Sequence, residues 1–165
     1  SILITNNKNL IRLVNQSLKQ QLIKLPKKKI ASQSLKNFGL AILATSKKNI
    51  LEVINAIAPE HLELYTNMNE EIVKGVKNAG SIFLGKFSPE AIGDYIAGPN
   101  HVLPTSGSAR FSSGLSVNDF LKRHSVIKIT KTGIERLGSS VINLALHENL
   151  DGHANSVKMR LKKRN

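Results

Sequence analysis

The chain has 165 residues, with 24 lysine or arginine residues against 11 aspartate or glutamate residues, a formal net charge of +13 and a pI near 10.2. It contains no cysteine, which excludes a disulfide framework, a thiolate metal site and a cysteine nucleophile. No apolar run reaches the roughly 18 residues that a membrane-spanning helix needs, and the opening residues lack a signal-peptide pattern, so we expect a cytoplasmic protein without a membrane partner.

The positive charge raises the question of a nucleic-acid partner, since lysine and arginine neutralise backbone phosphates. The basic residues are scattered, however, and they form clusters only at 27–29 and 160–164. Aromatic residues make up 4% of the chain, which leaves few side chains on which bases could stack. We therefore do not expect nucleic-acid binding to be the main function.

The first part of the chain alternates short apolar runs with amphipathic segments. Residues 1–5 predict a strand. Residues 7–25 carry leucine and valine at three- and four-residue spacing, which predicts a helix that Pro26 ends. A shorter basic helix is expected over 27–37, followed by a buried strand over 39–44.

The same alternation continues along the chain. Ser46 predicts the start of a helix that stops before Pro59, because proline disfavours helical geometry in the residue that precedes it. A strand over 61–65, a helix over 69–78 and a strand over 81–84 should follow. This order is typical of α/β folds, so we predict a partial Rossmann-like parallel sheet with flanking helices. No G-x-G-x-x-G fingerprint follows these strands, and no nucleotide site is visible.

The character of the chain changes after Gly114. We expect a short helix over 116–123 and a strand over 125–130. A longer helix should run over 132–150, and Gly152 should separate it from a final basic helix. The last part of the chain is therefore a small, mainly helical tail with little core of its own.

The stretch 88–107 carries most of the chemistry. Ser88 should cap a helix with Pro89 in its first turn, and the helical pattern should break at Gly93 and Gly98. Long loops punctuated by glycine and proline are often functional. The stretch holds an acid, a phenol, an amide and an imidazole, which are Asp94, Tyr95, Asn100 and His101.

Two further groups of residues could carry chemistry. Glu60 and His61 open a predicted strand, where histidine could act as a general base and the carboxylate could orient it or a water. From these two residues alone, a solvent-exposed acid beside a half-buried histidine is the more ordinary interpretation. Asp94 and His153 are suitable zinc ligands, but their separation in sequence matches no local zinc motif.

Four stretches of the chain resemble the histidinol dehydrogenase family. They are GDYIAGPNHVLPTSGSARFSSGLSV at 93–117, APEHLEL at 58–64, AGSIFLG at 79–85 and HENLDGHANSVKMRL at 147–161. The resemblance implies that Glu60 and His61 are the catalytic acid-base pair and that Asp94 and His153 bind a catalytic zinc ion. It also implies substrate contacts from His61, Asp94, Glu148 and His153, with His101 nearby.

The resemblance further implies a reaction and an assembly. The family oxidises L-histidinol to L-histidine through histidinaldehyde, uses zinc and NAD, and forms homodimers in which the tails are exchanged. Residues 1–115 would then be an incomplete Rossmann-like α/β domain with the catalytic loops, and residues 116–165 a mainly helical dimerisation tail.

The family is more than twice as long as this chain. In the family, the NAD domain and two further zinc ligands, a glutamine and a histidine, precede the matching region. We therefore expect a carboxy-terminal fragment that is inactive alone, with the NAD site and the remaining zinc ligands outside these residues. The alternative is a non-catalytic basic module that binds nucleic acid or protein and retains ancestral motifs.

Overall fold

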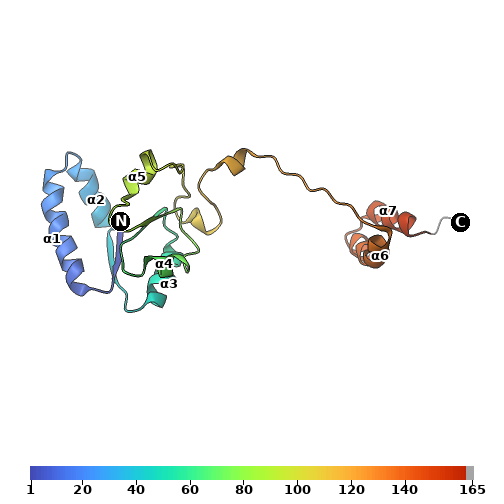
Figure 1. Cartoon of the computed structure of the whole chain (residues 1–165), viewed down its shortest axis with the longest axis horizontal. Coiled ribbons are helices and arrows are strands. Elements are labelled where there is room, and N and C mark those ends of the chain that lie inside the picture. Colours follow the sequence, from blue (N-terminus) through green and yellow to red (C-terminus); the bar gives the residue numbers. More distant parts are fainter. Residues whose placement is uncertain (163–165) are drawn as a thin grey trace. The chain divides into compact units, whose positions relative to one another are not determined.

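The computed structural model describes residues 1–162. Residues 163–165, which include the end of the predicted tail and of the basic cluster 160–164, lie outside the described residues. The chain forms two compact units, one over residues 1–120 and one from Leu121 onwards (Figure 1). No helix among the described residues is long and apolar enough to cross a membrane.

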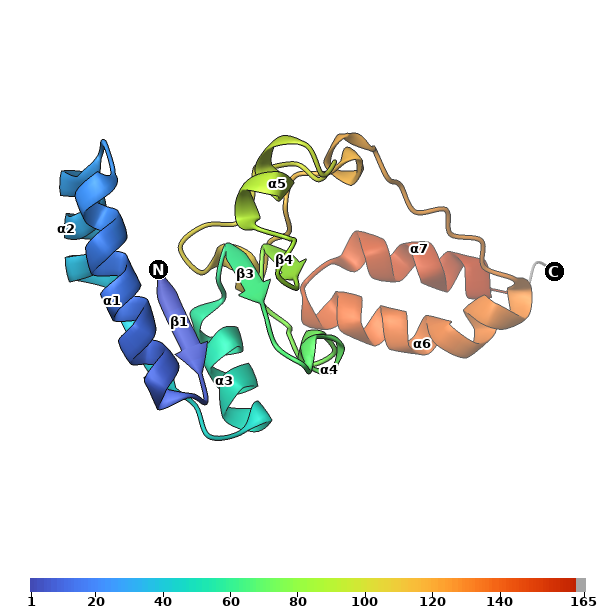
Figure 2. The same cartoon turned by 60° about the vertical axis from the view of Figure 1, so that its left-hand side comes forward.

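The first unit begins with a pair of parallel strands. β1 (Ile2–Thr5) pairs with β2 (Leu40–Leu43), and the chain between them forms α1 (Lys8–Lys24) and α2 (Lys28–Phe38). α1 and α2 pack against each other (Figure 2). The side chain of Asn7 accepts hydrogen bonds from the first amides of α1, which explains where that helix begins. All four elements confirm the predicted secondary structure, but β2 is not the buried strand expected over 39–44, since Leu40 and Leu43 are about half exposed.

A second pair of parallel strands follows. β3 (His61–Leu64) pairs with β4 (Ser81–Leu84), after α3 (Lys47–Ile57), which Ser46 caps. The helix predicted over 69–78 is shorter, since α4 (Asn69–Val73) ends five residues early. The side chain of Asn55 bonds to the carbonyl of Gly75 and to the amides of Lys77 and Asn78, which holds the backbone after α4 in a turn.

The strands form two separate sheets rather than the single parallel sheet expected from the sequence. Each sheet has two strands, and both pairs are parallel, so the α/β character is confirmed. The core lies beside the second sheet. Ile54 and Ile72 are fully buried there, and they pack with Leu62 and Leu64 of β3, which are also buried. Ile4 of β1 packs against this core, which joins the two sheets within one unit.

The helix that follows β4 differs from its prediction. α5 (Glu90–Tyr95) begins with Pro89 at the N-cap position, and Ser88 makes no capping hydrogen bond. Gly93 lies inside the helix rather than breaking it. The chain does leave the helical conformation before Gly98, whose φ of 104° favours glycine.

The segment after α5 is largely irregular. It contains two short 3₁₀ helices, η1 (Ser108–Arg110) and η2 (Val117–Phe120), and the second is shorter than the helix predicted over 116–123. The strand predicted over 125–130 is wrong. These residues are exposed, and among the described residues no neighbouring strand satisfies their backbone groups, so the alternating pattern alone does not produce a strand.

The second unit is a helical hairpin. α6 (Lys131–His147), capped by Thr130, packs against α7 (Asp151–Leu161) through the buried small residues Gly138, Ala145 and Ala154. The helix break expected at Gly152 lies earlier. Asn149 adopts a φ of 60°, a left-handed conformation that asparagine tolerates better than most residues, and this turn reverses the chain.

Candidate functional site

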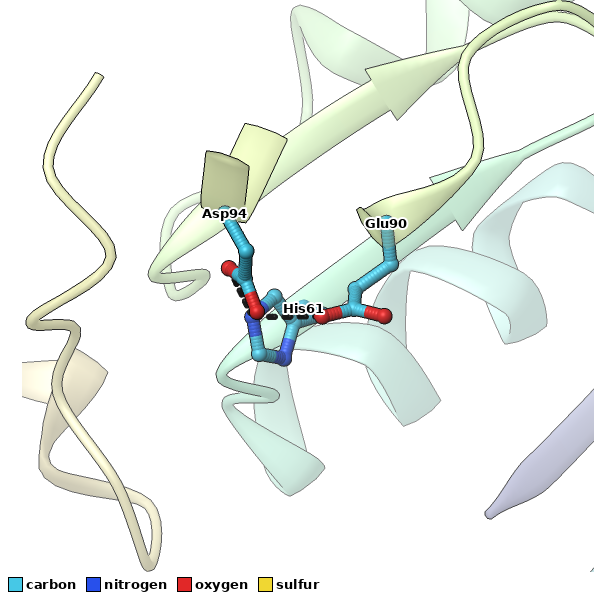
Figure 3. Close-up of side chains that lie close together, drawn as sticks. All are labelled: His61, Glu90 and Asp94. Carbon is cyan, nitrogen blue, oxygen red and sulfur yellow. Dashed lines mark ion pairs between the residues drawn. The ribbon is translucent and has the colours of Figure 1, made fainter. Parts of the chain in front are cut away.

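Three ionisable side chains of the first unit point toward one another (Figure 3). His61 Nε2, at the start of β3, lies 3.6 Å from Asp94 Oδ1 and 3.7 Å from Glu90 Oε1. Glu90 and Asp94 are four residues apart on α5, which places them on the same side of that helix. The cluster therefore brings together two segments, the beginning of β3 and one face of α5.

Within residues 1–162, the imidazole nitrogen in this cluster has no hydrogen-bond partner. His61 Nε2 is inaccessible to solvent and lies too far from both carboxylates for a normal hydrogen bond. A small polar atom or ion between these three groups could satisfy all of them, because the nearest ligand atoms of the three residues lie within 4.8 Å of one another. One imidazole and two carboxylates are donor types that zinc accepts, but of these three residues only Asp94 is a zinc ligand expected from the sequence.

The backbone at Glu60 and His61 is fixed by the neighbouring strand. The carbonyl of Glu60 accepts a hydrogen bond from the Ser81 amide at 2.9 Å, and Gly80 donates to Pro59. A Cβ atom on Gly80 would lie 2.5 Å from the Glu60 carbonyl oxygen, so glycine is required for this close approach. The Glu60 side chain is half-buried and does not belong to the three-residue cluster.

An aromatic side chain of β4 also lies next to the cluster. The ring of Phe83 lies beside the His61 imidazole, with the ring centroids 6.0 Å apart and the planes tilted by 38°. The same Phe83 ring contacts α5 at Gly93, where a side chain would collide with it. Phe83 therefore orients the imidazole and sets how closely α5 approaches.

The two carboxylates affect each other. Hydrogen bonding with Asp94 raises the pKa of the Glu90 carboxyl above its usual value. Partial burial and the negative charge of Asp94 act in the same direction, while His61 opposes them. The Glu90 carboxyl therefore loses its proton at a higher pH than an ordinary glutamate does.

Sequence analysis did not identify Glu90 as a site residue. In sequence it resembles an ordinary acidic residue in the first turn of a helix, where carboxylates are common. Glu90 and Asp94 are four residues apart, a spacing that places two side chains on one face of a helix. This spacing indicates a shared site only if the helix continues through Gly93, which the sequence did not predict.

A cavity adjoins the cluster on the side of Asp94. Its volume is about 380 Å³, and its lining includes Phe83, Ile92, Asp94, Asn100 and Leu103. Apolar walls with a few polar groups are typical of pockets for small ligands. Asp94 therefore lies at both the three-residue cluster and this cavity.

The other predicted site residues lie outside the cluster. His101 is exposed on the loop after α5, and its role stays a prediction. Glu148 follows the last residue of α6, and His153 lies in the first turn of α7, both exposed in the second unit. The joint binding of zinc by Asp94 and His153 stays a prediction as well. The two remaining histidines, His124 and His147, are exposed.

Comparison with known proteins identifies the family. The family model described as histidinol dehydrogenase matches residues 1–161. The chain is 49% identical over 162 residues to the histidinol dehydrogenase of Clostridium acetobutylicum, which covers 98% of this chain and 38% of that protein. It is 51% identical over 163 residues to that of Pelagibacter ubique, covering 99% of this chain and 38% of that protein.

A solved structure agrees with the sequence relatives. The crystal structure of histidinol dehydrogenase from Elizabethkingia anophelis matches with a TM-score of 0.81 and 39% identity, covering 97% of this chain and 37% of that chain. The chain thus spans less than two fifths of the length of the relatives it matches. From the match of the family model over nearly all of its residues, this chain belongs to the histidinol dehydrogenase family.

Proposed function

We propose that this chain provides the carboxy-terminal part of a histidinol dehydrogenase, which oxidises L-histidinol to L-histidine through histidinaldehyde and reduces two NAD molecules in succession. The observation that carries the proposal is the cluster of His61, Glu90 and Asp94 in a chain that is about half identical to enzymes of that name. The relatives give no support to a non-catalytic basic module.

His61 is proposed as the general base. It takes the proton of the substrate alcohol as hydride leaves for the first NAD. After releasing this proton, it takes a hydroxyl proton of the aldehyde hydrate as the second hydride leaves for the second NAD. No group in the described part of the chain forms a hydrogen bond with its Nε2 atom, and the two nearby carboxylates attract the positive charge that the imidazole gains with a proton. Glu60 is proposed to activate the water.

Asp94 and His153 are proposed as zinc ligands, with the remaining ligands and the NAD site outside these 165 residues. Zinc supplies Lewis-acid chemistry and anchors the substrate when it is bound, but it has no redox role. The carboxylate of Asp94, at the edge of the cavity, is placed to take part in substrate binding. Glu148 and His153 are proposed to contact the substrate, and His101 to lie next to it.

The wider assembly is also a proposal. The two parallel strand pairs would belong to an incomplete Rossmann-like domain over residues 1–115. Residues 116–165 would form the tail that is exchanged in a homodimer, and the exposed apolar residues of α6 support this role, since Leu144 is 66% exposed. The proposed location is the cytoplasm.

The proposal can be tested with a chimera in which this chain replaces the matching portion of the Clostridium acetobutylicum relative. We expect zinc-dependent NADH production from L-histidinol by the chimera and none by the 165-residue polypeptide alone. A folded, zinc-loaded and inactive chimera would contradict the proposed function. Activity of the polypeptide alone would contradict only the requirement for the rest of the enzyme.

A further inference from the structure

Glu63 reaches from the strand that carries His61 to the helix that carries the two carboxylates. Its side-chain Oε1 accepts a hydrogen bond from the backbone amide of Glu90 at 2.8 Å. Glu63 and His61 are two residues apart on β3, so their side chains lie on the same face of the strand. The same strand therefore provides the imidazole and the acceptor that holds the first residue of α5.

The beginning of α5 has no local support of its own. The first amides of a helix lack acceptors within the helix, and here no side chain at the N-cap position replaces them. A helix of only six residues is too short to be stable by itself. A carboxylate from another element is a strong replacement, because it bonds the free amide with an ionised acceptor and matches the positive end of the helix.

No ion pair among the described residues explains the position of the Glu63 side chain. Among residues 1–162, no lysine, arginine or histidine nitrogen lies within ion-pair distance of its carboxylate. The side chains on either side of it, Leu62 and Leu64, are buried in the core on the opposite face of β3. The contact to the Glu90 amide is therefore the specific interaction that this side chain makes.

We propose that Glu63 is a positioning residue of the candidate site, which fixes the first turn of α5 so that Glu90 and Asp94 face His61. Because Glu90 and Asp94 lie about one turn apart on the same short helix, a shift of its first turn moves both carboxylates. The structural part of this inference needs no knowledge of the reaction, and its effect on turnover rests on the proposed function.

Hydrogen exchange of the Glu90 amide in the 165-residue chain tests the structural part directly. We expect Glu63→Ala to speed this exchange about tenfold or more, as for the loss of a hydrogen bond to a charged acceptor. Glu63→Gln retains an acceptor oxygen at the same reach and should keep most of the protection. Glu71→Ala is a matched control, because it removes another exposed glutamate that also makes one contact with a distant residue, an ion pair with Lys47.

The outcomes separate this inference from the proposed function. Unchanged exchange at Glu90 in Glu63→Ala, or equal loss in Glu63→Gln and Glu63→Ala, would overturn the inference whatever the chimera does. If Glu63→Ala does not fold, a folded Glu63→Gln variant with an unprotected Glu90 amide would also overturn it. In an active chimera we expect Glu63→Ala to lower kcat about tenfold with an unchanged KM for NAD, and Glu63→Gln to restore most of it. An inactive parent chimera would count against the proposed function alone.

Discussion

Gly93 of α5 lies against the ring of Phe83 on β4, and a Cβ atom on Gly93 would be 2.5 Å from Cε1 of that ring. This separation is shorter than any normal van der Waals contact, so a side chain here must displace either the ring or the helix. The ring also lies beside His61. The pair Gly93 and Phe83 therefore links the position of α5 to the orientation of the imidazole.

Gly93→Ala should impair the site because of this contact. We expect a loss of stability of about 1–3 kcal/mol, typical of overpacking, together with reduced turnover in the chimera. Urea denaturation and NADH production measure the two effects. Gly152→Ala is the control, since a Cβ there meets nothing within 4 Å inside α7 and should stabilise that helix by up to about 1 kcal/mol.

A compensating variant makes this prediction more specific. Phe83→Leu removes the ring atoms that the new methyl group would meet, so Gly93→Ala combined with Phe83→Leu should be less damaged than the sum of the two single variants. Strict additivity in a double-mutant cycle would show that the contact between these residues does not limit the position of α5.

His61→Asn should lower kcat of the chimera by about 10²–10⁴-fold, the usual effect of removing a general base, with little change in KM for L-histidinol. Asparagine retains polarity but cannot accept a proton near neutral pH. Steady-state kinetics across the pH range provide the measurement. Near-normal turnover at every pH would assign the base to another residue.

Asp94→Asn and His153→Asn should act on the metal rather than on proton transfer. We expect each variant to lower the zinc content of the purified chimera, because a neutral amide is a weaker zinc ligand than a carboxylate or an imidazole. Metal analysis after dialysis measures this without any assay of activity. Full zinc occupancy in His153→Asn would remove that residue from the proposed ligands.

The ion pair between Lys47 and Glu71 predicts a pH dependence of stability in the first unit. The Lys47 ammonium, 2.8 Å from Glu71 Oε2, lowers the pKa of this carboxyl from its usual 4.5. A carboxyl whose folded-state pKa is lowered contributes stability above its unfolded pKa and loses it as the pH falls through the folded value.

The difference in Tm between the parent and Glu71→Gln should therefore be small but present at pH 7 and should vanish once the pH falls below the lowered pKa of Glu71. It should also shrink in high salt, since both side chains are largely exposed. Glu70→Gln is the control, because Glu70 lies in the same first turn of α4 and forms no ion pair with any of the described residues. A difference that grows as the pH falls would contradict the sign.

Local signals in the sequence explain why most elements of the first unit were predictable. The side chains of Asn7 and Ser46 accept hydrogen bonds from the first amides of α1 and α3, and Pro26 follows the end of α1. The errors arise where a distant residue determines the outcome. α5 begins at an amide held by Glu63, 27 residues earlier, and α4 ends where Asn55 holds the following turn.

The residues of the candidate site also differ in whether local sequence signals identify them. His61 and Asp94 were found through motifs, whereas Glu90 was missed because its significance comes from tertiary contacts. The strand predicted over 125–130 failed for a related reason. Its alternating apolar residues are typical of a strand, but a strand needs a partner strand, and residues 1–162 provide none for it.

The last prediction concerns the tail. Leu137, Val141 and Leu144 of α6 are between 44% and 66% exposed, so the hairpin leaves apolar surface that the second unit does not cover. Two candidate substrate-binding residues, Glu148 and His153, belong to this hairpin. A tail that packs on another surface and also supplies residues to a site suits exchange across a two-fold dimer.

Mixed dimers of the chimera test the exchange. A Glu60→Gln, His61→Asn double variant and a His153→Asn variant should each be inactive as homodimers, yet their heterodimer has one intact site if the tails are exchanged. Random reassociation of equal amounts should then restore about a quarter of the parent activity, because half of the dimers are mixed and each has one working site of two. Mixing His61→Asn with Asp94→Asn, both in the first unit, should restore none. Heterodimers that form without any recovery in the first mixture would show that each tail serves its own subunit.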